Sequence, residues 1–207
     1  MHASRRNLAL LLCVTAVAFA ADISRGAAAF GQAPGDVQAK APAILFIIRH
    51  AEKPMDDKAP DLAPQGFKRA SAIPYLFLPL PGSSVPPRLP KPDVLFASEA
   101  AKHSNRPIET ITPLAQALHL RINHDYEDRE TAKIADAVMS GKYAGKVVLI
   151  CWHHGEIPQL AKAFGVENAP KIWDDTVFDK IWKITWVDGK PQMTILPQML
   201  LKGDSTQ

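Results

Sequence analysis

Two strongly apolar runs, each followed directly by basic or potentially basic side chains, constrain the fold of this chain more than any other feature. The runs are ILFIIRH at residues 44–50 and VVLICWHH at residues 147–154. Apolar side chains at consecutive positions are typical of strands covered on both faces, because a strand with one solvated face alternates apolar and polar residues. Such strands occur mostly in parallel sheets with helices on either side, so the runs predict an α/β fold.

The segments around these runs read as alternating helices and strands. A stretch with seven prolines, from Pro74 to Pro92, is expected to form a long surface loop, because proline cannot donate to a ladder. A closing hairpin with its turn at Asp188-Gly189 is expected at the end of the chain. The expected helices cover residues 64–77, 106–120, 128–143 and 156–165, and the further strands residues 92–98, 121–126, 181–187 and 191–200. The prediction is a sandwich with a mostly parallel sheet.

The first 20 residues read as an export signal. Arg5 and Arg6 precede an apolar run from Leu8 to Phe19, and small residues follow at the positions that a signal peptidase reads. The run is shorter than the ~20 residues that a membrane helix requires, so a retained anchor is the less favoured alternative. We therefore expect an exported protein, periplasmic or secreted, with no membrane insertion after cleavage.

One domain is expected over residues 41–201. Residues 21–40 are rich in small and turn-forming side chains and read as a flexible lead-in, and residues 202–207 read as a C-terminal tail. Removal of the signal takes Cys13 away and leaves Cys151 alone, so no internal disulfide is expected.

Charge and histidine spacing exclude two classes of protein. Loss of the two signal arginines leaves 22 basic side chains, 24 less 2, against 21 acidic ones, which does not predict a basic face for nucleic acid. The chain has no HxH, HExxH or CxxC spacing, so neither a metal ion nor another cofactor is expected. No pattern in the sequence indicates the oligomeric state.

The ends of the two apolar runs indicate where a ligand binds. In open α/β sheets, ligands lie beyond the carboxyl ends of the strands. Arg49, His50, His153 and His154 follow two such strands and are expected to meet there. A cationic crevice that holds imidazoles suggests a small phosphate ester, because arginine forks bind phosphate oxygens.

Four short motifs, in order along residues 43–165, resemble those of the histidine phosphatase superfamily. RHAEKP at residues 49–54 is similar to its RHxE/G opening, and LAPQGFKRA at residues 62–70 to its LTxxGxxRA segment. RPIET at residues 106–110 resembles RxxxT, and HGEI at residues 154–157 resembles HGxxI. The resemblance implies a three-layer, phosphoglycerate mutase-like fold with helices on both faces of the sheet, in an exported bacterial-type member.

The resemblance also implies a mechanism. His50 would form a phosphohistidine that water hydrolyses, while Arg49, Arg106 and His154 hold the phosphoryl oxygens. We prefer His154 to His153 because Gly155 follows it, as in the family. The activity implied is a metal-independent phosphomonoester hydrolase for a small phosphorylated substrate.

The general acid is less well marked. Glu127 is the first candidate, with Asp128, Glu130 and Glu156 as rivals, and no spacing selects one. The serine that the family carries shortly before its second arginine corresponds either to Ser98 or, in its place, to Ser104. If no acid is in position, substrates with good leaving groups are expected.

Three other functions are compatible with the motifs. A phosphoglycerate mutase would share the site, but its cytoplasmic substrates conflict with an export signal. A domain of the same fold could bind phosphate or a partner without catalysis, and a phosphoprotein or phosphohistidine phosphatase could use the same residues.

Overall fold

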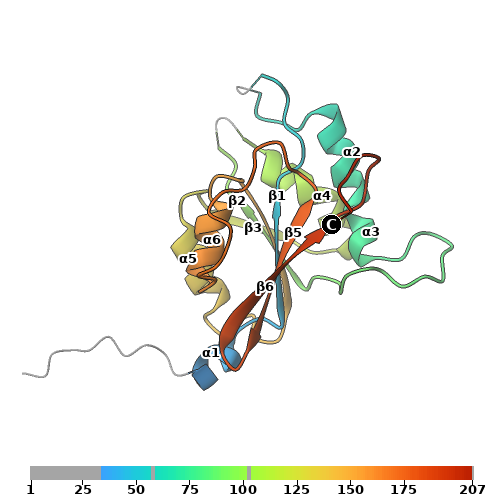
Figure 1. The fold of residues 1–207 in the computed structure, drawn as a ribbon. Coiled ribbons are helices and arrows are strands. Elements are labelled where there is room, and N and C mark those ends of the chain that lie inside the picture. Colours follow the sequence, from blue (N-terminus) through green and yellow to red (C-terminus); the bar gives the residue numbers. More distant parts are fainter. Residues whose placement is uncertain (1–33, 57–58, 102–103, 207) are drawn as a thin grey trace, which may run out of the picture. The chain divides into compact units, whose positions relative to one another are not determined.

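A six-stranded sheet forms the centre of the domain in the computed structural model, which describes residues 34–56, 59–101 and 104–206 (Figure 1). The strands are β1 (Ile44–Arg49), β2 (Val94–Ser98), β3 (Ile122–Tyr126), β4 (Val147–Trp152), β5 (Lys180–Val187) and β6 (Lys190–Pro197). Their order is β3-β2-β4-β1-β5-β6. The first four strands run parallel, β5 pairs antiparallel with β1, and β6 pairs antiparallel with β5 at the edge of the sheet. The predicted mostly parallel sheet is confirmed.

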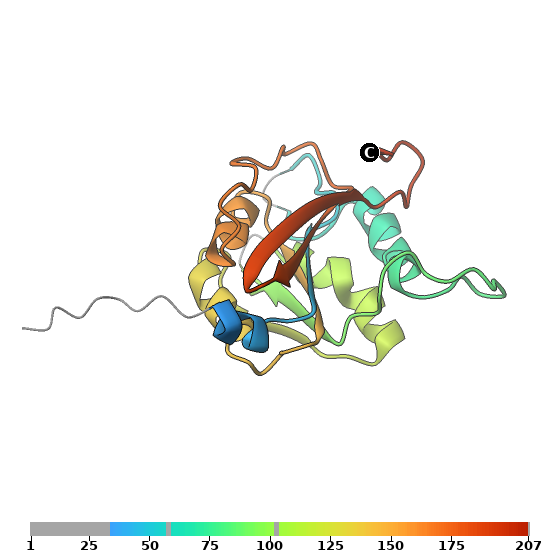
Figure 2. The ribbon, with the colours of Figure 1, turned by 60° about the horizontal axis from the view of Figure 1, so that its bottom comes forward.

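Helices cover both faces of this sheet (Figures 1 and 2). Their bounds are α1 (Pro34–Lys40), α2 (Pro64–Ala72), α3 (Pro74–Phe77), α4 (Arg106–Leu118), α5 (Thr131–Val138) and α6 (Ile157–Ala163). Buried residues of α3 and α4 pack in one apolar cluster, and those of α5 and α6 pack in another. The three layers that the sequence predicts are therefore present.

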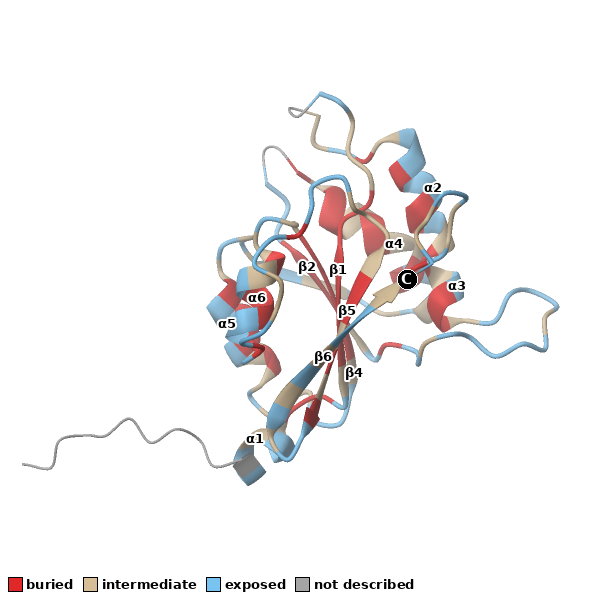
Figure 3. Cartoon of the chain, in the orientation of Figure 1, coloured by how far each residue is buried: buried red, intermediate tan, exposed pale blue. Residues whose placement is uncertain are grey.

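Strand β1 explains why its sequence is apolar at every position. Leu45 and Ile47 belong to the cluster under α5 and α6, whereas Phe46 and Ile48 belong to the cluster under α3 and α4. Successive side chains of a strand point to opposite faces, so a strand between two helical layers must be apolar throughout. Figure 3 shows the central strands as the most buried part of the domain.

The hairpin and the proline loop follow the sequence with one exception. Asp188 and Gly189 join β5 to β6 with positive φ angles of 51° and 73°, the conformation of a tight hairpin turn. The loop is shorter than expected, because Pro74 begins the short helix α3 and only the residues after it lack helix and strand. Proline is well tolerated in the first turn of a helix.

The boundaries of the domain differ from the expectation at both ends. The predicted signal and most of the lead-in lie outside the described residues, but the last part of the lead-in forms α1 instead of a flexible segment. Val37 packs against the core, and Gln38 Oε1 accepts a hydrogen bond of 3.1 Å from the Gly189 N–H. At the other end, Asp204 and Ser205 are hydrogen-bonded to the domain, so the expected tail is bound as far as residue 205. None of the helices in the described ranges has the length and apolar character needed to cross a bilayer.

Candidate active site

Two imidazole rings lie side by side at the carboxyl ends of β1 and β4. The strands pair in parallel with Arg49 opposite Trp152, so the next residue of each strand, His50 and His153, leaves the sheet at the same level. The His50 N–H continues the ladder to the Trp152 carbonyl at 3.0 Å. The ring centres of His50 and His153 are 5.1 Å apart, with an angle of 67° between the planes.

The His50 ring is held as a neutral imidazole with a defined tautomer. Its Nδ1 lies 2.7 Å from the Ala51 carbonyl oxygen, and because a carbonyl can only accept, Nδ1 carries the proton and Nε2 the lone pair. Burial, as the largest cause, together with the charges of His153, Arg49 and Arg106 lowers the pKa of His50 to about 2, against the opposing effect of the Ala51 hydrogen bond. Nε2 is therefore available as a nucleophile at any ordinary pH.

Arg49 is buried beside His50 and uses one edge of its guanidinium for structure. Nη1 donates to the carbonyl oxygens of Asp174, Asp175 and Val177 at 3.3, 2.6 and 3.0 Å. The guanidinium carbon lies 3.8 Å from the ring centre of Phe178. Nε and Nη2 are buried and have no hydrogen-bond partner among the described residues. Burial lowers the pKa of Arg49 to about 10, so the group stays protonated and keeps two donors for an anion.

Arg106 begins α4 and is also buried. Its Nη1 donates to the Ala59 carbonyl at 2.7 Å. One helical turn later, the Thr110 hydroxyl donates to the Arg106 carbonyl at 2.7 Å and accepts the Ala51 N–H at 2.8 Å. The spacing of the RPIET motif thus ties the start of α4 to the loop that carries His50.

The structure separates the two neighbouring histidines. His153 lines a hollow of ≈ 510 Å³ together with Arg106, whereas His154 lines a second hollow of ≈ 530 Å³ with Asp174 and Asp175. Nδ1 of His154 is buried without a partner in the described part of the chain. Burial lowers the pKa of His153 to about 4, and burial followed by the Arg49 charge lowers the pKa of His154. The ring beside His50 is that of His153, whereas the sequence favours His154.

The first hollow also distinguishes between the four candidate acids. Glu127 and Asp128 line it with His153, and so does Glu99, which sequence reasoning missed. Glu130 instead forms an ion pair with Lys133 and accepts the Glu127 N–H at 3.2 Å.

The remaining candidate residues are Glu156, Ser98 and Ser104. Glu156 precedes α6 and lines neither hollow. Ser104 lines the first hollow, whereas Ser98 is buried at the end of β2. Of the two serines, Ser104 is thus the one that lines the hollow with His153 and Arg106.

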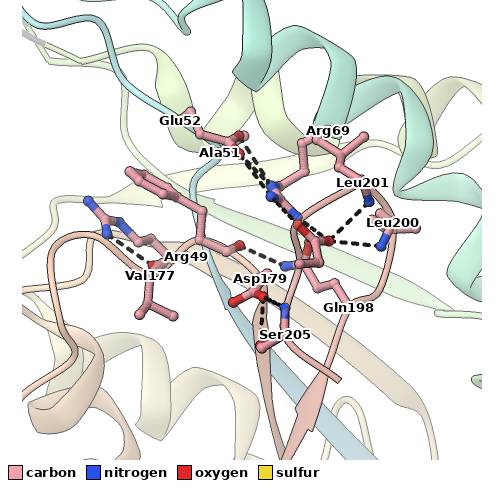
Figure 4. Close-up of polar contacts among 12 residues, drawn as sticks. Arg49, Ala51, Glu52, Arg69, Val177, Asp179, Gln198, Leu200, Leu201 and Ser205 are labelled. Atoms are coloured by element: carbon pink, nitrogen blue, oxygen red, sulfur yellow. Dashed lines mark hydrogen bonds and ion pairs between the residues drawn. The ribbon is translucent and has the colours of Figure 1, made fainter. Parts of the chain in front are cut away.

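The second motif packs against the first. The Gly66 backbone approaches Glu52 so closely that an added Cβ would lie 2.4 Å from the Glu52 carbonyl oxygen. Arg69 is buried and forms an ion pair with Glu52 at 2.8 Å, so it is not a solvated side chain (Figure 4). Both residues of the LAPQGFKRA segment therefore position the loop after His50. Across the described ranges, no three or more His, Cys, Asp or Glu side chains are grouped so as to hold a metal ion.

Solved structures of phosphatases share this fold. A mutant phosphoserine phosphatase from Entamoeba histolytica, solved with phosphoserine, matches 76% of this chain and 98% of its own, with a TM-score of 0.52 and 13% identity. The same enzyme solved with 3-phosphoglyceric acid matches 73% of this chain and 94% of its own, with a TM-score of 0.50 and 13% identity.

A bacterial structure gives a similar match. A protein from Escherichia coli, proposed to be an alpha-ribazole-5′-P phosphatase, matches 75% of this chain and 96% of its own, with a TM-score of 0.50 and 16% identity. Neither a protein-family model nor a curated protein matches the sequence. The chain therefore has the fold of these phosphatases, and the phosphoglycerate mutase-like fold expected from the motifs is confirmed.

Proposed function

We propose that this chain, which has the fold of the histidine phosphatases, hydrolyses phosphomonoesters through a phosphohistidine on Nε2 of His50. One observation carries the proposal: a neutral imidazole with a fixed lone pair lies beside a buried arginine that keeps two donors for an anion. The buried Arg106 adds a second cation at the same strand ends. This combination of nucleophile and cationic donors is what phosphoryl transfer requires.

The proposed reaction has two steps. In the first, His50 Nε2 attacks phosphorus while Arg49 and Arg106 hold the phosphoryl oxygens, and the bond to the alcohol oxygen breaks as the N–P bond forms. The departing oxygen takes a proton from Glu127 or Asp128, which line the hollow next to His153. In the second step, water attacks phosphorus, the same carboxylate takes its proton, and inorganic phosphate leaves as the N–P bond breaks.

Access to His50 sets a condition on this mechanism. The residue is only 2% exposed, and the rings of His153 and Phe178 lie 5.1 and 6.2 Å from its ring, centre to centre. Side chains around His50 must therefore move before a phosphate reaches Nε2. The enclosure favours the second candidate function, a domain of the same fold that binds phosphate or a partner without turnover.

The proposed substrate class is a small phosphorylated compound. The Entamoeba histolytica enzyme was solved with phosphoserine and with 3-phosphoglyceric acid. The hollow beside His153 has room for the alcohol part of such a compound. We also propose that residues 1–20 direct the protein out of the cytoplasm. It then acts as a periplasmic or secreted enzyme.

Hydrolysis of p-nitrophenyl phosphate by the purified chain from residue 21 onward, with EDTA present across pH 4 to 8, tests the function. We expect turnover that EDTA leaves unchanged and that inorganic phosphate inhibits competitively, because the two arginines supply the charge that stabilises the transition state. Phosphate binding without turnover of this or other phosphate esters would favour the binding domain. Absence of both turnover and phosphate binding would contradict both functions.

The neighbouring histidines provide a matched pair of variants. We propose that His153 donates to the phosphoryl group, because its ring faces His50 and shares a hollow with Arg106. His153→Ala should lower kcat/KM by about 100-fold or more, the usual effect of removing one transition-state donor. His154→Ala should lower it by about tenfold or less, because its ring lines the other hollow. The reverse order of effects would return the role to His154, as the HGEI motif suggests.

A further inference from the structure

The last residues of the domain contact both walls of the candidate site. We call residues 198–205 the C-terminal clamp. It follows β6 and turns back toward the loop that carries His50 and toward the segment that covers Arg49, as Figure 4 shows. Its last residues, 202–205, belong to the part of the chain that the sequence suggests is a tail.

The first wall is the loop after His50. Arg69 lies between Glu52 and Asp204, with ion pairs of 2.8 Å to each, and the Asp204 side chain is 5% exposed. Asp204 also accepts the N–H groups of Leu200 and Leu201 at 2.8 and 3.1 Å, so the same carboxylate shapes the clamp. Because Glu52 is two residues from His50, Asp204 acts on the nucleophile loop through Arg69.

The second wall is the segment over Arg49. The buried Gln198 accepts from Arg69 Nη1 at 3.1 Å and donates through Nε2 to the Phe178 carbonyl at 3.1 Å. Its backbone N–H donates to the Asp179 carbonyl at 2.7 Å. The clamp therefore fixes the main chain of Phe178, whose ring contacts the Arg49 guanidinium.

Ser205, at the far end of the clamp, also binds the segment over Arg49. The backbone N–H and the hydroxyl of Ser205 donate to the Asp179 carboxylate at 2.5 and 2.6 Å. Both ends of the clamp thus hold the residue that follows Phe178.

The contacts between Arg69, Glu52 and Asp204 join buried charged groups. Removal of one member of a buried ion pair leaves the others without compensation, so the remaining groups rearrange. Burial raises the pKa of Asp204, but the bonds from Arg69 and from the Leu201 and Leu200 N–H groups lower it overall, so the carboxylate is charged at neutral pH. The carboxylates of Asp204 and Glu52 thus hold the Arg69 guanidinium from two sides.

We propose that the C-terminal clamp positions the phosphate site, with Asp204 and Gln198 as its positioning residues. The clamp sets the place of His50 through Arg69 and Glu52, and the place of Arg49 through Phe178. This inference rests on the proposed function for its effect on turnover, but not for its effect on the geometry of His50.

Asp204→Asn tests the clamp with little change of shape. We expect KM for p-nitrophenyl phosphate and the Kd for inorganic phosphate to rise by about tenfold or more, because misplacement of positioned groups by about 1 Å can cost about 100-fold. Asp204→Glu should restore part of the loss, because it keeps the charge. The control is Asp93→Asn at an exposed position, which removes the charge of the carboxylate that accepts the Val147 N–H at 2.9 Å at the opposite end of the strands. The control should lower Tm and leave KM and Kd within about twofold.

A second readout needs no activity. The His50 Nδ1–H is buried and bonded to the Ala51 carbonyl, so its imidazole proton should exchange slowly with solvent in NMR spectra. Each variant is measured at a temperature the same number of degrees below its own Tm. Under this condition, we expect the exchange to be about tenfold faster in Asp204→Asn than in Asp93→Asn. Equal exchange rates in the two variants would overturn the clamp, even if the parent chain turned out to bind no phosphate. Loss of turnover in the parent together with faster exchange in Asp204→Asn would instead support the clamp and reject the proposed function.

Discussion

His50→Ala is expected to abolish turnover, with kcat lowered by about 10⁴-fold or more, because the variant lacks the nitrogen proposed to form the covalent intermediate. Phosphate binding should survive in part, since the Nε and Nη2 donors of Arg49 remain. Steady-state kinetics with p-nitrophenyl phosphate give the first quantity, and calorimetric titration with inorganic phosphate gives the second. The comparison separates loss of chemistry from loss of the binding site.

Two controls define the meaning of this result. Thermal unfolding shows whether the variant is folded, and His50→Gln tests whether a polar side chain of similar length without a comparable nucleophilic nitrogen restores any rate. Turnover within about tenfold of the parent in either variant would falsify the covalent assignment.

Acidification is expected to destabilise the fold already above the range in which carboxylates titrate. The folded state lowers the pKa of His50 to about 2 and that of His153 to about 4, so both rings stay neutral in the fold. In the unfolded chain they bind protons below about pH 6.5. Unfolding therefore takes up protons as the pH falls below 6.5, and the free energy of unfolding decreases.

The lowered pKa values of the two histidines also set the size of the expected loss of stability. Between pH 6.5 and 5 each histidine should remove up to about 2 kcal/mol from the free energy of unfolding, with less for the more exposed His153. Urea unfolding at half-unit pH steps measures the slope, and His50→Gln should make it shallower, because one of the three histidines with a lowered pKa is removed. Between pH 7 and 8.5, the free energies of unfolding of parent and variant should change with pH in parallel, because both histidines are then neutral in the folded and in the unfolded state. An equal slope in both proteins below pH 6.5 would contradict the neutral, buried state of His50.

The sequence predicts the sheet and its helices because the signals are local. Runs such as ILFIIRH carry their own evidence of burial on two faces, and the Asp188-Gly189 turn carries its own hairpin signal. The motifs also place Arg49, His50 and Arg106 at the same strand ends, where the structure has them. For these residues, the position in the chain and the position in the fold are tied by a single strand or helix.

The remaining parts of the site depend on contacts between distant residues. Whether His153 or His154 lies beside His50 depends on the strand register that puts Trp152 opposite Arg49. No local pattern in the sequence encodes this register. The pairing of Arg69 with Asp204 joins residues 135 positions apart. Similarly, Glu127 and Asp128 are distinguished from Glu130 only by the hollow that they line and by the partner that Glu130 has in Lys133.

The strand order has a consequence for how the chain folds during synthesis. β1, which begins at Ile44, is made before the other strands, yet it pairs only with β4 and β5, which begin at Val147 and Lys180. Contacts of such long sequence separation form slowly and late. A ribosome-bound chain therefore carries β1 without neighbours until most of the domain has emerged, and it lacks the partner of Arg69 until Asp204 has followed. Alignment of the two histidines therefore waits for β4, completion of the sheet waits for β5 and β6, and the ion pair of Arg69 with Asp204 forms only after these strands.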